Sequence, residues 1–503
     1  MKIIHTDQVE PKSLRPWERS QVYNGLDACV TTEVLEVLLP QLSEHTSATY
    51  AFSRALQGPV LEMRLRGVKI DLARRQQVIG EFESRITKLE GQLYRLVADG
   101  VGFHGFNWRS YKDLQELFYD YLKIPVIRKW GRPTTDRNAR EKMEAYLIAR
   151  PFISHINRIA DLGKKISVLQ TEIDPDGRIR TSYNIAGTNT GRFSSSLSEF
   201  GTGGNLQNVE ESLRSIFIAD KGMKLAKFDA KQGESYCVGA TEWNLFKDGR
   251  YLDACETGDI HTATTRQCWP NLPWTGDLNR DKALAEEPYY RGHSRRFMAK
   301  KIGHGSNYAG QPSTLAQQAK VEVWPVEEFQ IKYFRAYPAH LRWHAWVETQ
   351  IKQKGWLVNL TGRKRWFFGR RDDQETLRKA IAYDPQGSLA DIVNHGMLNV
   401  FHQRTAALYM HDHDAITVQY PEEKEDEIVP RILEQLRYEV PLAHGRSLTI
   451  PYDCKVGWNK GDWSKENPNG LKDYVPSDKR HREKEVGLLD RPVYRTHGRL
   501  GFG

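Results

Sequence analysis

Two aspartates that adjoin expected strands could hold divalent cations. The segment Met223–Phe228 predicts a short apolar strand that ends at Asp229, and the alternating segment Ala415–Tyr420 predicts another strand that begins after Asp414. Two carboxylates on adjacent strand ends can hold two cations about 4 Å apart, and that geometry drives in-line phosphoryl transfer. Either aspartate alone is more often a solvated strand-end residue, so the chemistry rests on the pair.

The residues just before Asp414 leave two alternatives open. Residues 411–414 read His-Asp-His-Asp, and alternate residues of a strand share a face, so His411 and His413 could instead bind a transition metal. Asp412 could also take the place of Asp414 as the second cation ligand. We favour Asp414, because the other choice would place its carboxylate on a buried strand position, where it is costly.

A third pattern combines cations with an aromatic residue at helical spacing. Arg296, Lys300, His304 and Tyr308 are each four residues apart, so on a helix they form one slowly drifting stripe about 18 Å long. Cations at its start could bind a triphosphate and the aromatic ring at its end a base; the alternative is a solvated basic face. Three glycines on this stretch are poor helix formers and favour packing of a large planar ligand there. They are Gly303, Gly305 and Gly310.

The composition is typical of a folded protein that binds a polyanion. Its 503 residues carry 73 Lys and Arg against 64 Asp and Glu, a net charge of +9, and their number predicts about three domains. The 13 Trp, 22 Tyr and 18 Phe exclude a wholly disordered chain, and no apolar run reaches the ~20 residues of a membrane span. Basic clusters with aromatic neighbours make nucleic acid the leading partner class. The clusters are Arg295-Arg296 with Phe297, Lys300-Lys301, Arg363-Lys364-Arg365 with Trp366, Phe367 and Phe368, and Arg370-Arg371.

Cysteine use and the N-terminal residues indicate a reducing compartment. The 5 cysteines include no C-x-x-C pair, which excludes a disulfide framework and makes a zinc ribbon a poor fit. The first twenty or so residues lack the apolar segment of a secretory signal, and their acidic residues argue against a transit peptide. We therefore expect a cytoplasmic protein.

The elements that must position these residues are mostly helices, joined by hairpins and loops. Helical periodicity is expected over residues 21–48, 50–100 with a break at 66–71, 138–170, most of 240–350, and 374–404. Strand–turn–strand patterns are expected over residues 171–179, 355–368 and 406–421. Residues 187–208 are expected to form a loop, and residues 464–503 a polar and poorly ordered tail.

From about residue 20 to residue 463, the order of these motifs resembles the family A (PolI-like) DNA polymerases, and most of all the compact phage-encoded members. The matching segments, in chain order, are Thr190 to Ser195 with the family's T-G-R-L-S-S, Asn205 to Asn208 with N-L-Q-N, Asp229 to Glu234 with motif A, Gly258 to His261 with the D-I-H segment, Arg296 to Tyr308 with motif B, Arg378 with Gln386-Gly387, and His413-Asp414 with motif C. In this register the strand after Asp414 aligns without gaps through Pro421.

The resemblance implies a role for each matched residue. Asp229 and Asp414 would bind two Mg²⁺ ions, with Mn²⁺ as an alternative, and Lys300 would donate a proton to pyrophosphate. Contacts to the nucleotide would come from Arg296, Lys300, His304, Tyr308, Gln232, His261 and Glu234, the last as the steric gate against a ribose 2′-OH. Contacts to DNA would come from Arg192, Asn205, Gln207, Asn208, Arg378, Gln386 and His413.

The chain departs from the family pattern at several matched positions. His304 replaces the aromatic residue in the middle of motif B, which touches the sugar of the incoming nucleotide, so sugar discrimination is expected to differ. Ala230 and Lys231 replace the Tyr-Ser of motif A, Ala415 replaces the Glu of motif C, and Ala382 replaces an Asn common before Gln-Gly.

A fragment of another motif lies near the N-terminus. Tyr23 and Asp27 resemble the Y-x-x-x-D that closes the family's 3′–5′ exonuclease domain, while the two earlier exonuclease motifs have no counterpart upstream. A purely structural helix is the alternative. We expect a remnant that packs on the polymerase body, with proofreading absent or supplied by a separate chain.

The resemblance implies an α+β fold of the right-hand polymerase type, with an antiparallel palm sheet and a truncated exonuclease remnant. The expected domains are the remnant over residues 1–48, the thumb and the entry to the palm over 49–170, the first part of the palm over 171–239, the fingers over 240–372, the second part of the palm over 373–463, and the tail over 464–503. The expected partners are primed template and dNTPs, with a separate exonuclease or a processivity factor as a further candidate. We expect a monomer in the cytoplasm of a bacterial host.

Three other functions remain open at this point. A single-subunit RNA polymerase would share the palm chemistry, but Glu234 at the gate argues against it. A basic DNA-binding scaffold that has lost catalysis would account for the departures at Ala230, Lys231, His304 and Ala415. A nuclease could use the same carboxylates, but it would have no need of motif B.

Overall fold

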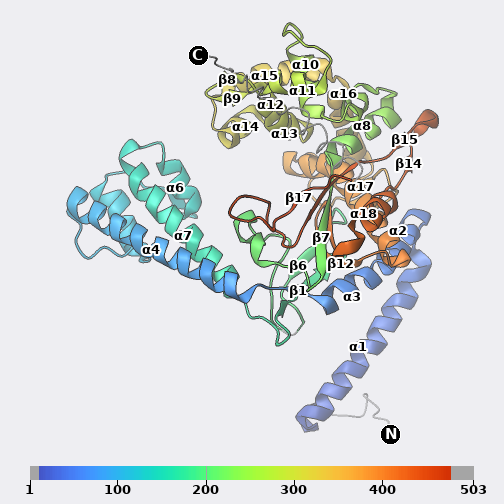
Figure 1. Ribbon diagram of the computed structural model, residues 1–503, viewed down its shortest axis with the longest axis horizontal. Helices are drawn as coiled ribbons and strands as arrows, with labels where there is room; N and C mark the ends of the chain where they lie inside the picture. The colour runs from blue at the N-terminus through green and yellow to red at the C-terminus, as the bar shows by residue number, and fades with distance from the viewer. Residues whose placement is uncertain (1–10, 200, 477–503) are drawn as a thin grey trace, which may run out of the picture. The chain divides into compact units, whose positions relative to one another are not determined.

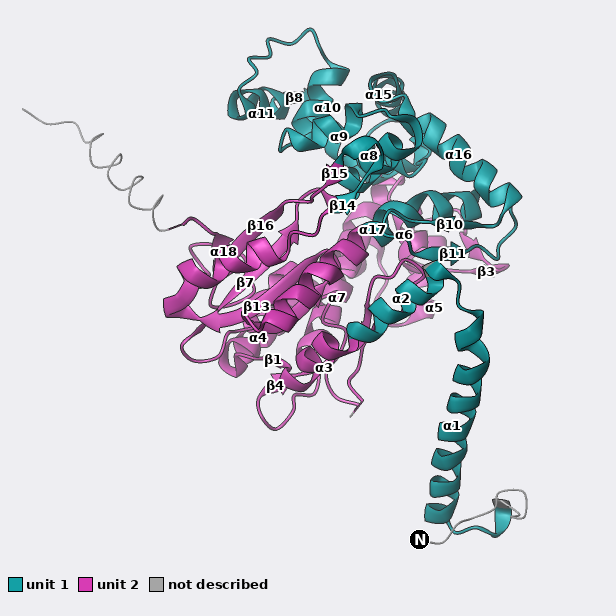
Figure 2. Cartoon of the chain, turned by 90° about the vertical axis from the view of Figure 1, so that its right-hand side faces the viewer, with its two compact units in different colours: residues 1–56, 234–388, 440–446 teal, residues 57–233, 389–439, 447–503 magenta. Residues whose placement is uncertain are grey.

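The computed structural model describes residues 11–199 and 201–476 (Figure 1). The chain forms two compact units, each assembled from separate stretches of sequence (Figure 2). The first unit contains the segment that ends at Leu56, Glu234–Ser388 and Val440–Arg446. The second contains Gln57–Gly233, Leu389–Glu439 and the chain from Ser447 onward.

The second unit is built on a five-stranded sheet in which all neighbouring strands are antiparallel. The strand order is β12 (Ala407–Asp412), β13 (Ala415–Pro421), β7 (Met223–Ala230), β16 (Tyr452–Gly457) and β17 (Lys472–Asp473). On β7, Ala226 and Phe228 are fully buried, while Lys227 and Asp229 are half-buried and point to the opposite face. One face of the central strand therefore builds the core, and the other carries charge.

A long helical hairpin extends from this unit, and Figure 1 shows α4 (Leu72–Val101) and α7 (Arg150–Leu169) side by side. The side chain of Asp71 caps the start of α4, and Gly102 ends the helix in a left-handed conformation at φ 74°. Apolar residues at helical spacing, such as Leu93 and Ile153, are fully buried in the hydrophobic core to which both helices contribute.

Shorter elements complete the second unit. Its helices are α3 (Gln57–Arg66), α5 (Tyr111–Gln115), η4 (Glu116–Tyr121), α6 (Arg137–Met143), η5 (Leu147–Ala149), η6 (Glu211–Ile216), η8 (Glu422–Lys424) and α18 (Glu425–Gln435). Its short strands are β1 (Val68–Lys69) paired with β4 (Arg178–Ile179), β2 (Arg128–Lys129) with β3 (Arg132–Pro133), β5 (Ser182–Asn184) with β6 (Ser194–Ser196), and β15 (Ser447–Leu448).

The first unit is mainly helical. It contains η2 (Pro11–Ser13), α1 (Pro16–Leu38), η3 (Leu39–Gln41), α2 (Glu44–Ala55), α8 (Gly233–Phe246), α9 (Arg250–Glu256), α10 (Ile260–Cys268), α11 (Leu278–Glu286), α12 (Arg295–Met298), η7 (Ala299–Gly303), α13 (His304–Asn307), α14 (Pro312–Ala319), α15 (Val323–Ala336), α16 (Ala339–Gln353) and η9 (Ala443–Gly445). Its strands are β8 (Pro288–Tyr290), β9 (His293–Ser294), β10 (Trp356–Val358), β11 (Lys364–Trp366) and β14 (Val440–Pro441). The helix α17 (Gln374–Gln403) begins in this unit and continues into the other.

Several predicted elements are confirmed and four are corrected. The strand at 223–229, the hairpins at 355–368 and 406–421 and the helix at 374–404 all form. The single helix expected over 21–48 is two helices, because Pro40 cannot continue α1 and Ser43 caps the start of α2.

The strand–turn–strand prediction for residues 171–179 is half right. The turn forms, with Gly177 N donating to Asp174 O at 2.9 Å and Asp174 N donating to Arg178 O at 2.9 Å, but the strand after it pairs with β1 rather than with a strand before the turn. The loop expected over 187–208 contains β6, paired with β5.

The tail prediction is corrected in its first part. Residues 464–476 are ordered, and β17 within them adds a strand to the sheet beside β16. The remainder of the predicted tail, residues 477–503, lies outside the described residues. Over the residues that the structure describes, no helix has both the length and the apolar character needed to cross a membrane.

Candidate active site

The sheet of the second unit brings three aspartates into one row. In the strand register, Asp412 faces Ala415, Ala415 faces Asp229, and Asp229 faces Asp453 on β16. Residues directly opposite each other in antiparallel strands share a face, so Asp412, Asp229 and Asp453 lie on the same side of the sheet. Asp414 lies in the turn between β12 and β13, and its carbonyl accepts a hydrogen bond from Ala230 N at 3.0 Å. The structure thus places both predicted cation ligands at one end of the sheet.

Each carboxylate of the row lies near a lysine of its own unit. Lys227 Nζ is 2.7 Å from Asp229 Oδ2, and Lys231 Nζ is 3.8 Å from Asp453 Oδ1. These contacts are partly open to solvent, with the side chains of Asp229 and Asp453 44% and 63% exposed. Both carboxylates are therefore accessible to a cation.

Asp412 is in a different environment, because its partner is buried. Lys460 is only 4% exposed, and its Nζ contacts both Asp412 Oδ2 and the sulfur of Met410. Burial lowers the pKa of Lys460, while the charge and hydrogen bond of Asp412 oppose that shift. The Asp412 carboxylate is thus engaged by a buried ammonium group.

The two histidines of the 411–414 run do not share a site. The ring of His411 is buried, its Nε2 lies 3.0 Å from Asn394 Oδ1, and it packs 4.5 Å from the ring of Phe193. Burial lowers the pKa of His411 to about 4, so the ring is neutral at pH 7. His413 is a turn residue with φ 58°, and its Nε2 lies 3.4 Å from Asn208 Oδ1. In the described part of the chain, no group of three His, Cys, Asp or Glu side chains forms a metal cluster.

The predicted DNA-contacting residues of the second unit lie in a hydrogen-bonded loop. Asn205 Oδ1 accepts from Ser195 Oγ at 2.6 Å and from Asn208 N at 3.2 Å, which joins the Thr-Gly-Arg-Phe-Ser-Ser and Asn-Leu-Gln-Asn segments. Asn205 and Asn208 are exposed and Arg192 is half-buried. Gln207 is only 6% exposed, and its Nε2 has no hydrogen-bond partner within the described residues.

In the first unit, the motif B stripe lies on a helix that contains a π turn. The turn η7 separates α12 from α13; Lys300 is exposed on η7 and His304 at the start of α13. A π turn takes more residues than an α turn, so residues four apart across it stay better aligned than on a regular α-helix. Arg296, 19% exposed in its side chain, is held 2.9 Å from Asp259 Oδ2 and 3.3 Å from Glu286 Oε1.

The start of α10 explains the link between the Asp-Ile-His segment and motif B. Asp259 caps α10 by accepting from His261 N at 3.1 Å and Thr262 N at 3.3 Å, while it also binds Arg296. Burial raises the pKa of Asp259, but the hydrogen bonds from Thr262 and the charge of Arg296 lower it by more. The net result is a decrease in this pKa. Burial lowers the pKa of His261 to about 4, so that ring offers a neutral hydrogen-bonding group at pH 7.

Three of the predicted nucleotide contacts meet at the start of α8. The hydroxyl of Tyr308 donates to Glu234 Oε2, and His304 Nε2 lies 3.7 Å from the same oxygen. The rings of His304 and Tyr308 are 5.2 Å apart, edge to face. Two residues before Glu234 in the chain, Gln232 adopts a left-handed conformation with φ 54°, at the junction of β7 and α8.

The interpretation of the motif B glycines is wrong. A Cβ at Gly305 would lie 2.3 Å from a methyl of Leu315, and one at Gly310 would lie 2.7 Å from the Gly305 carbonyl. The side chain of Leu315 on α14 already fills this space, and the chain at Gly310 turns back onto its own backbone. Internal packing therefore requires these two glycines, and no planar ligand is needed to explain them.

The hairpin β10–β11 and the segment after it carry a dense basic and aromatic surface. Residues 351–371 contain seven Lys and Arg and no Asp or Glu. Lys364 Nζ lies 4.2 Å from the ring of Trp356 and 4.8 Å from that of Trp366, and Phe368 is 94% exposed. On α17, Arg378 is exposed and Gln386 half-buried. Exposed rings beside cations are the usual surface for single-stranded nucleic acid.

Sequence reasoning missed Asp453, Lys227 and Lys460. Only the strand register shows that Asp453 faces Asp229, and only tertiary packing buries Lys460 against Asp412. A weak signal existed in the alternation of Asp453 and Lys455, which is typical of one charged face of a strand.

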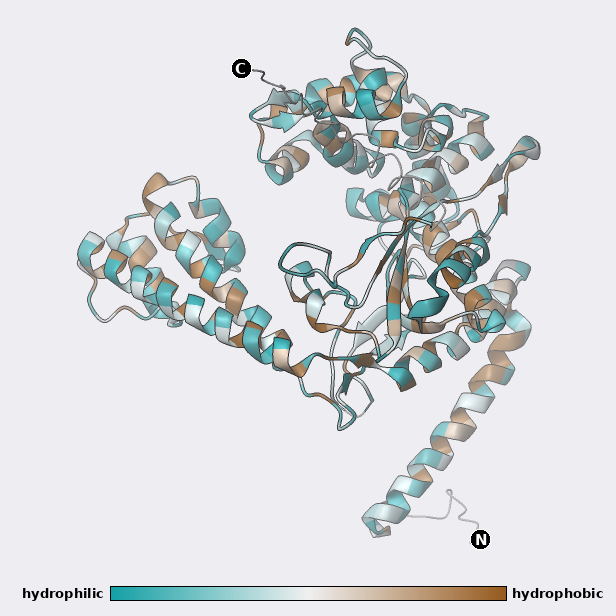
Figure 3. Ribbon diagram, in the orientation of Figure 1, coloured by the Kyte–Doolittle hydropathy of each residue, from teal (hydrophilic) through white to brown (hydrophobic). Residues whose placement is uncertain are grey.

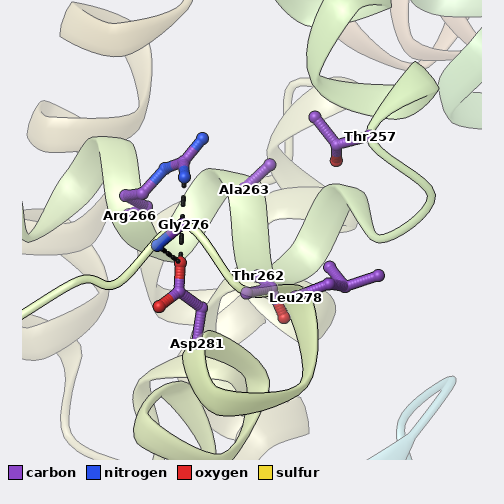
Figure 4. A pocket seen from close by; sticks show the side chains of 7 residues that line it. All are labelled: Thr257, Thr262, Ala263, Arg266, Gly276, Leu278 and Asp281. Carbon is purple, nitrogen blue, oxygen red and sulfur yellow. Dashed lines mark hydrogen bonds and ion pairs between the residues drawn. The ribbon is translucent and has the colours of Figure 1, made fainter.

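A pocket of about 150 Å³ lies between α10 and α11, and Thr262 is among the residues that line it (Figure 4). Its floor is formed by Asp281, which is 3% exposed and accepts from Thr275 N at 2.7 Å and Gly276 N at 3.1 Å, with Arg266 3.8 Å away. None of the predicted site residues lines it. Asp281 thus closes the loop before α11.

Known DNA polymerases are similar to this chain in sequence. The chain is 26% identical over 467 residues to the thermostable DNA polymerase I of Thermus filiformis, covering 87% of this chain and 50% of that protein. It is 25% identical over 419 residues to DNA polymerase I of Geobacillus stearothermophilus, covering 77% and 44%. The chain thus spans about half the length of these relatives.

The fold has a counterpart among solved structures, the POL domain of Pol1 from M. smegmatis in complex with a DNA primer-template and dNTP. The TM-score is 0.65 at 23% identity, covering 80% of this chain and 69% of that one. The profile of DNA polymerase family A matches residues 73–465, well over half of the sequence. The chain therefore belongs to DNA polymerase family A.

Proposed function

We propose that this protein is a template-directed DNA polymerase that adds dNTPs to a primer 3′-OH. The observation that carries the proposal is the pair of carboxylates at one end of an antiparallel sheet, Asp229 on β7 and Asp414 in the adjacent turn. Family membership supports it, as does the M. smegmatis structure, whose title names a primer-template and dNTP.

The donor set suits Mg²⁺. Asp229 and Asp414 offer hard oxygen ligands, and Mg²⁺ in such sites is held by one or two carboxylates together with substrate phosphates and water. Two bound ions would supply charge stabilisation for in-line attack on the α-phosphate. Mn²⁺ is the proposed alternative ion.

The proposed roles of the other residues differ between the two units. In the second unit, Asp229 and Asp414 fix the cation positions, and Lys227 limits the repulsion between them. In the first unit, Arg296 and the exposed Lys300 bind the triphosphate, and Lys300 donates a proton to the leaving pyrophosphate. Gln232 and His261, a neutral donor at pH 7, add nucleotide contacts.

Sugar selection is assigned to the group around Glu234. We propose that Glu234, held by Tyr308, blocks a ribose 2′-OH, while His304 contacts the sugar and Tyr308 the nascent pair. The proposed DNA contacts are Arg192, Asn205, Gln207, Asn208, His413, Arg378 and Gln386. The single-stranded template is assigned to the basic and aromatic surface of residues 351–371.

Primer extension with dNTPs and Mg²⁺ tests the proposal, with Asp412→Ala as the matched control. Wild type and Asp412→Ala should extend the primer, while Asp229→Ala and Asp414→Ala should not. If Asp414→Ala extends and Asp412→Ala does not, the function stands and the choice of Asp414 is wrong. Binding of primed DNA with no extension in Mg²⁺ or Mn²⁺ would favour the DNA-binding scaffold. Extension with rNTPs as good as with dNTPs would favour an RNA polymerase. Cleavage of DNA without primer or dNTP would favour a nuclease.

We further propose that a separate chain with 3′–5′ exonuclease activity docks on α1. The expected packing of this helix on the polymerase body is wrong for α1, because none of its residues is buried. Tyr23, Val30 and Val37 on one face are 63%, 53% and 61% exposed (Figure 3 shows the apolar positions along the helix). An isolated apolar helix face gains its stability from a partner. The purified chain should not degrade a primer from its 3′ end; excision by this chain alone would contradict the idea.

The remaining assignments are proposals of the same kind. Residues 49–170 are assigned to the thumb, 171–239 and 373–463 to the palm, 240–372 to the fingers, and 1–48 to the exonuclease remnant. We place the protein, as a monomer, in the cytoplasm of a bacterial host, as expected if a phage encodes it.

A further inference from the structure

A chain of buried polar side chains runs behind the motif B helix in the first unit. Its members are each at most 3% exposed, yet all carry polar atoms that are costly to bury without partners. Such a set persists only where every group is satisfied, which makes its geometry highly specified. The members are Glu242 on α8, Tyr251 on α9, Asn307 on α13, Tyr333 on α15 and His340 on α16.

The hydrogen bonds along this chain all run in one direction. The Tyr333 hydroxyl donates to Asn307 Oδ1 at 2.6 Å, so it has no proton left for His340, and His340 Nε2 at 2.9 Å must donate to it. Asn307 Nδ2 donates to the Tyr251 hydroxyl at 3.0 Å, and that hydroxyl donates to Ser235 Oγ at 3.3 Å.

At the far end, the chain meets a buried carboxylate. His340 Nδ1 contacts Glu242 Oε1. His344 Nε2 adds a hydrogen bond to the carbonyl of Asn307 at 2.8 Å. Both the amide side chain and the backbone of Asn307 are therefore held.

Two members of the chain adjoin the two residues of the proposed gate. Asn307 precedes Tyr308, and Ser235 follows Glu234. Tyr308 donates to Glu234, so the buried bridge from Asn307 through Tyr251 to Ser235 runs beside that hydrogen bond and joins the same two helices.

We infer that Tyr251 is a positioning residue that sets the Tyr308–Glu234 hydrogen bond, and through it the selection of deoxyribose over ribose. The inference rests on the proposed role of Glu234 as the steric gate. Discrimination against one hydroxyl depends on where the blocking group stands, and small displacements of a positioned group are costly. Tyr251 contacts no substrate in this scheme; it acts by fixing Asn307 relative to Ser235.

The test is Tyr251→Phe, which removes the bridging hydroxyl and keeps the ring. Tyr337→Phe is the matched control: Tyr337 is 2% exposed, its ring lies 4.9 Å from that of Tyr251, and its hydroxyl bonds Thr264 outside the bridge. In primer extension by the full chain, Tyr251→Phe should lower the ratio of kcat/KM for dNTP to that for rNTP about five- to tenfold, the value of one net hydrogen bond. Tyr337→Phe should keep the wild-type ratio at a comparable loss of thermal stability.

Ser235→Ala removes the other end of the bridge and should lower the ratio in the same way, with no further decrease in the double variant. An unchanged ratio in Tyr251→Phe, or an equal decrease in Tyr337→Phe, overturns the inference while wild-type extension leaves the proposed function intact. Hydrogen exchange is the readout independent of catalysis. Amides of residues 304–310 should exchange faster in Tyr251→Phe than in Tyr337→Phe, and equal exchange also overturns the inference.

Discussion

The charged face of the sheet and the polar interior of the mainly helical unit place ionisable groups in opposite ways. On the sheet, the side chains of Asp229 and Asp453 are 44% and 63% exposed, and water screens their attraction to the nearby lysines. Inside the helices, Glu242 and His340 are essentially inaccessible, and His340 Nδ1 contacts the Glu242 carboxylate. Exposed charges can bind a ligand and contribute little to the stability of the fold. Buried charges fix the positions of their neighbours, and removal of one partner strongly destabilises the protein.

The largest effect should come from the accessible side of this comparison. Asp229→Asn should lower kcat by about 10³-fold or more, because a lost cation ligand removes several kcal/mol of charge stabilisation. Asp453→Asn, opposite it in the sheet, is the matched control and should lower kcat far less, since Asp453 only adds to the local field. Single-turnover extension measures both, and equal losses would make Asp453 a cation ligand in its own right.

Lys460 is the exception within the sheet, because it is a buried charge on the otherwise accessible face. Lys460→Met should destabilise the protein by about 3–5 kcal/mol, because it leaves the Asp412 carboxylate, 17% exposed, without its partner. Adding Asp412→Leu should recover most of that loss. Urea unfolding followed by circular dichroism measures the change; a single variant as stable as wild type would show that the pair is solvated.

The pH dependence of stability tests the buried groups of the mainly helical unit. Burial lowers the pKa of His344 to about 4, below its ordinary value of 6.5, so the unfolded chain takes up the proton first as pH falls. The stability that neutral His344 contributes is fully present above pH 6.5 and is lost as the pH falls towards 4. At pH 5 the loss amounts to about 2 kcal/mol. His344→Gln should flatten the fall in unfolding free energy between pH 7 and pH 5. His155→Gln, at an exposed histidine, should leave the slope unchanged.

The smallest effect concerns the exposed rings of the hairpin segment. Phe368→Ala should weaken binding to a primer-template with a single-stranded overhang about tenfold, the value of one stacked base, and leave thermal stability unchanged. Trp324→Ala, at a ring 52% exposed on α15, should change neither. Fluorescence anisotropy with blunt and overhanging duplexes measures this, and an equal loss on blunt duplex would assign Phe368 to the duplex.

Local signals in the sequence predicted much of the fold. The apolar strand before Asp229, the hairpin over 355–368 and the helix over 374–404 all form where periodicity placed them, because each depends on neighbours a few residues away. The expected helix over 21–48 failed at Pro40, a local signal that outweighed the longer periodic pattern.

By itself, the sequence determined the identity of the chemistry: which carboxylates, cations and rings exist, and the motif order that the family profile also matches. Tertiary structure alone decided how they are used. It paired β4 with β1, placed Asp453 opposite Asp229, filled the space at Gly305 with Leu315, and buried His340 against Glu242. These outcomes join residues that are remote in the chain, and no local pattern encodes a contact whose free energy depends on the burial that folding itself creates.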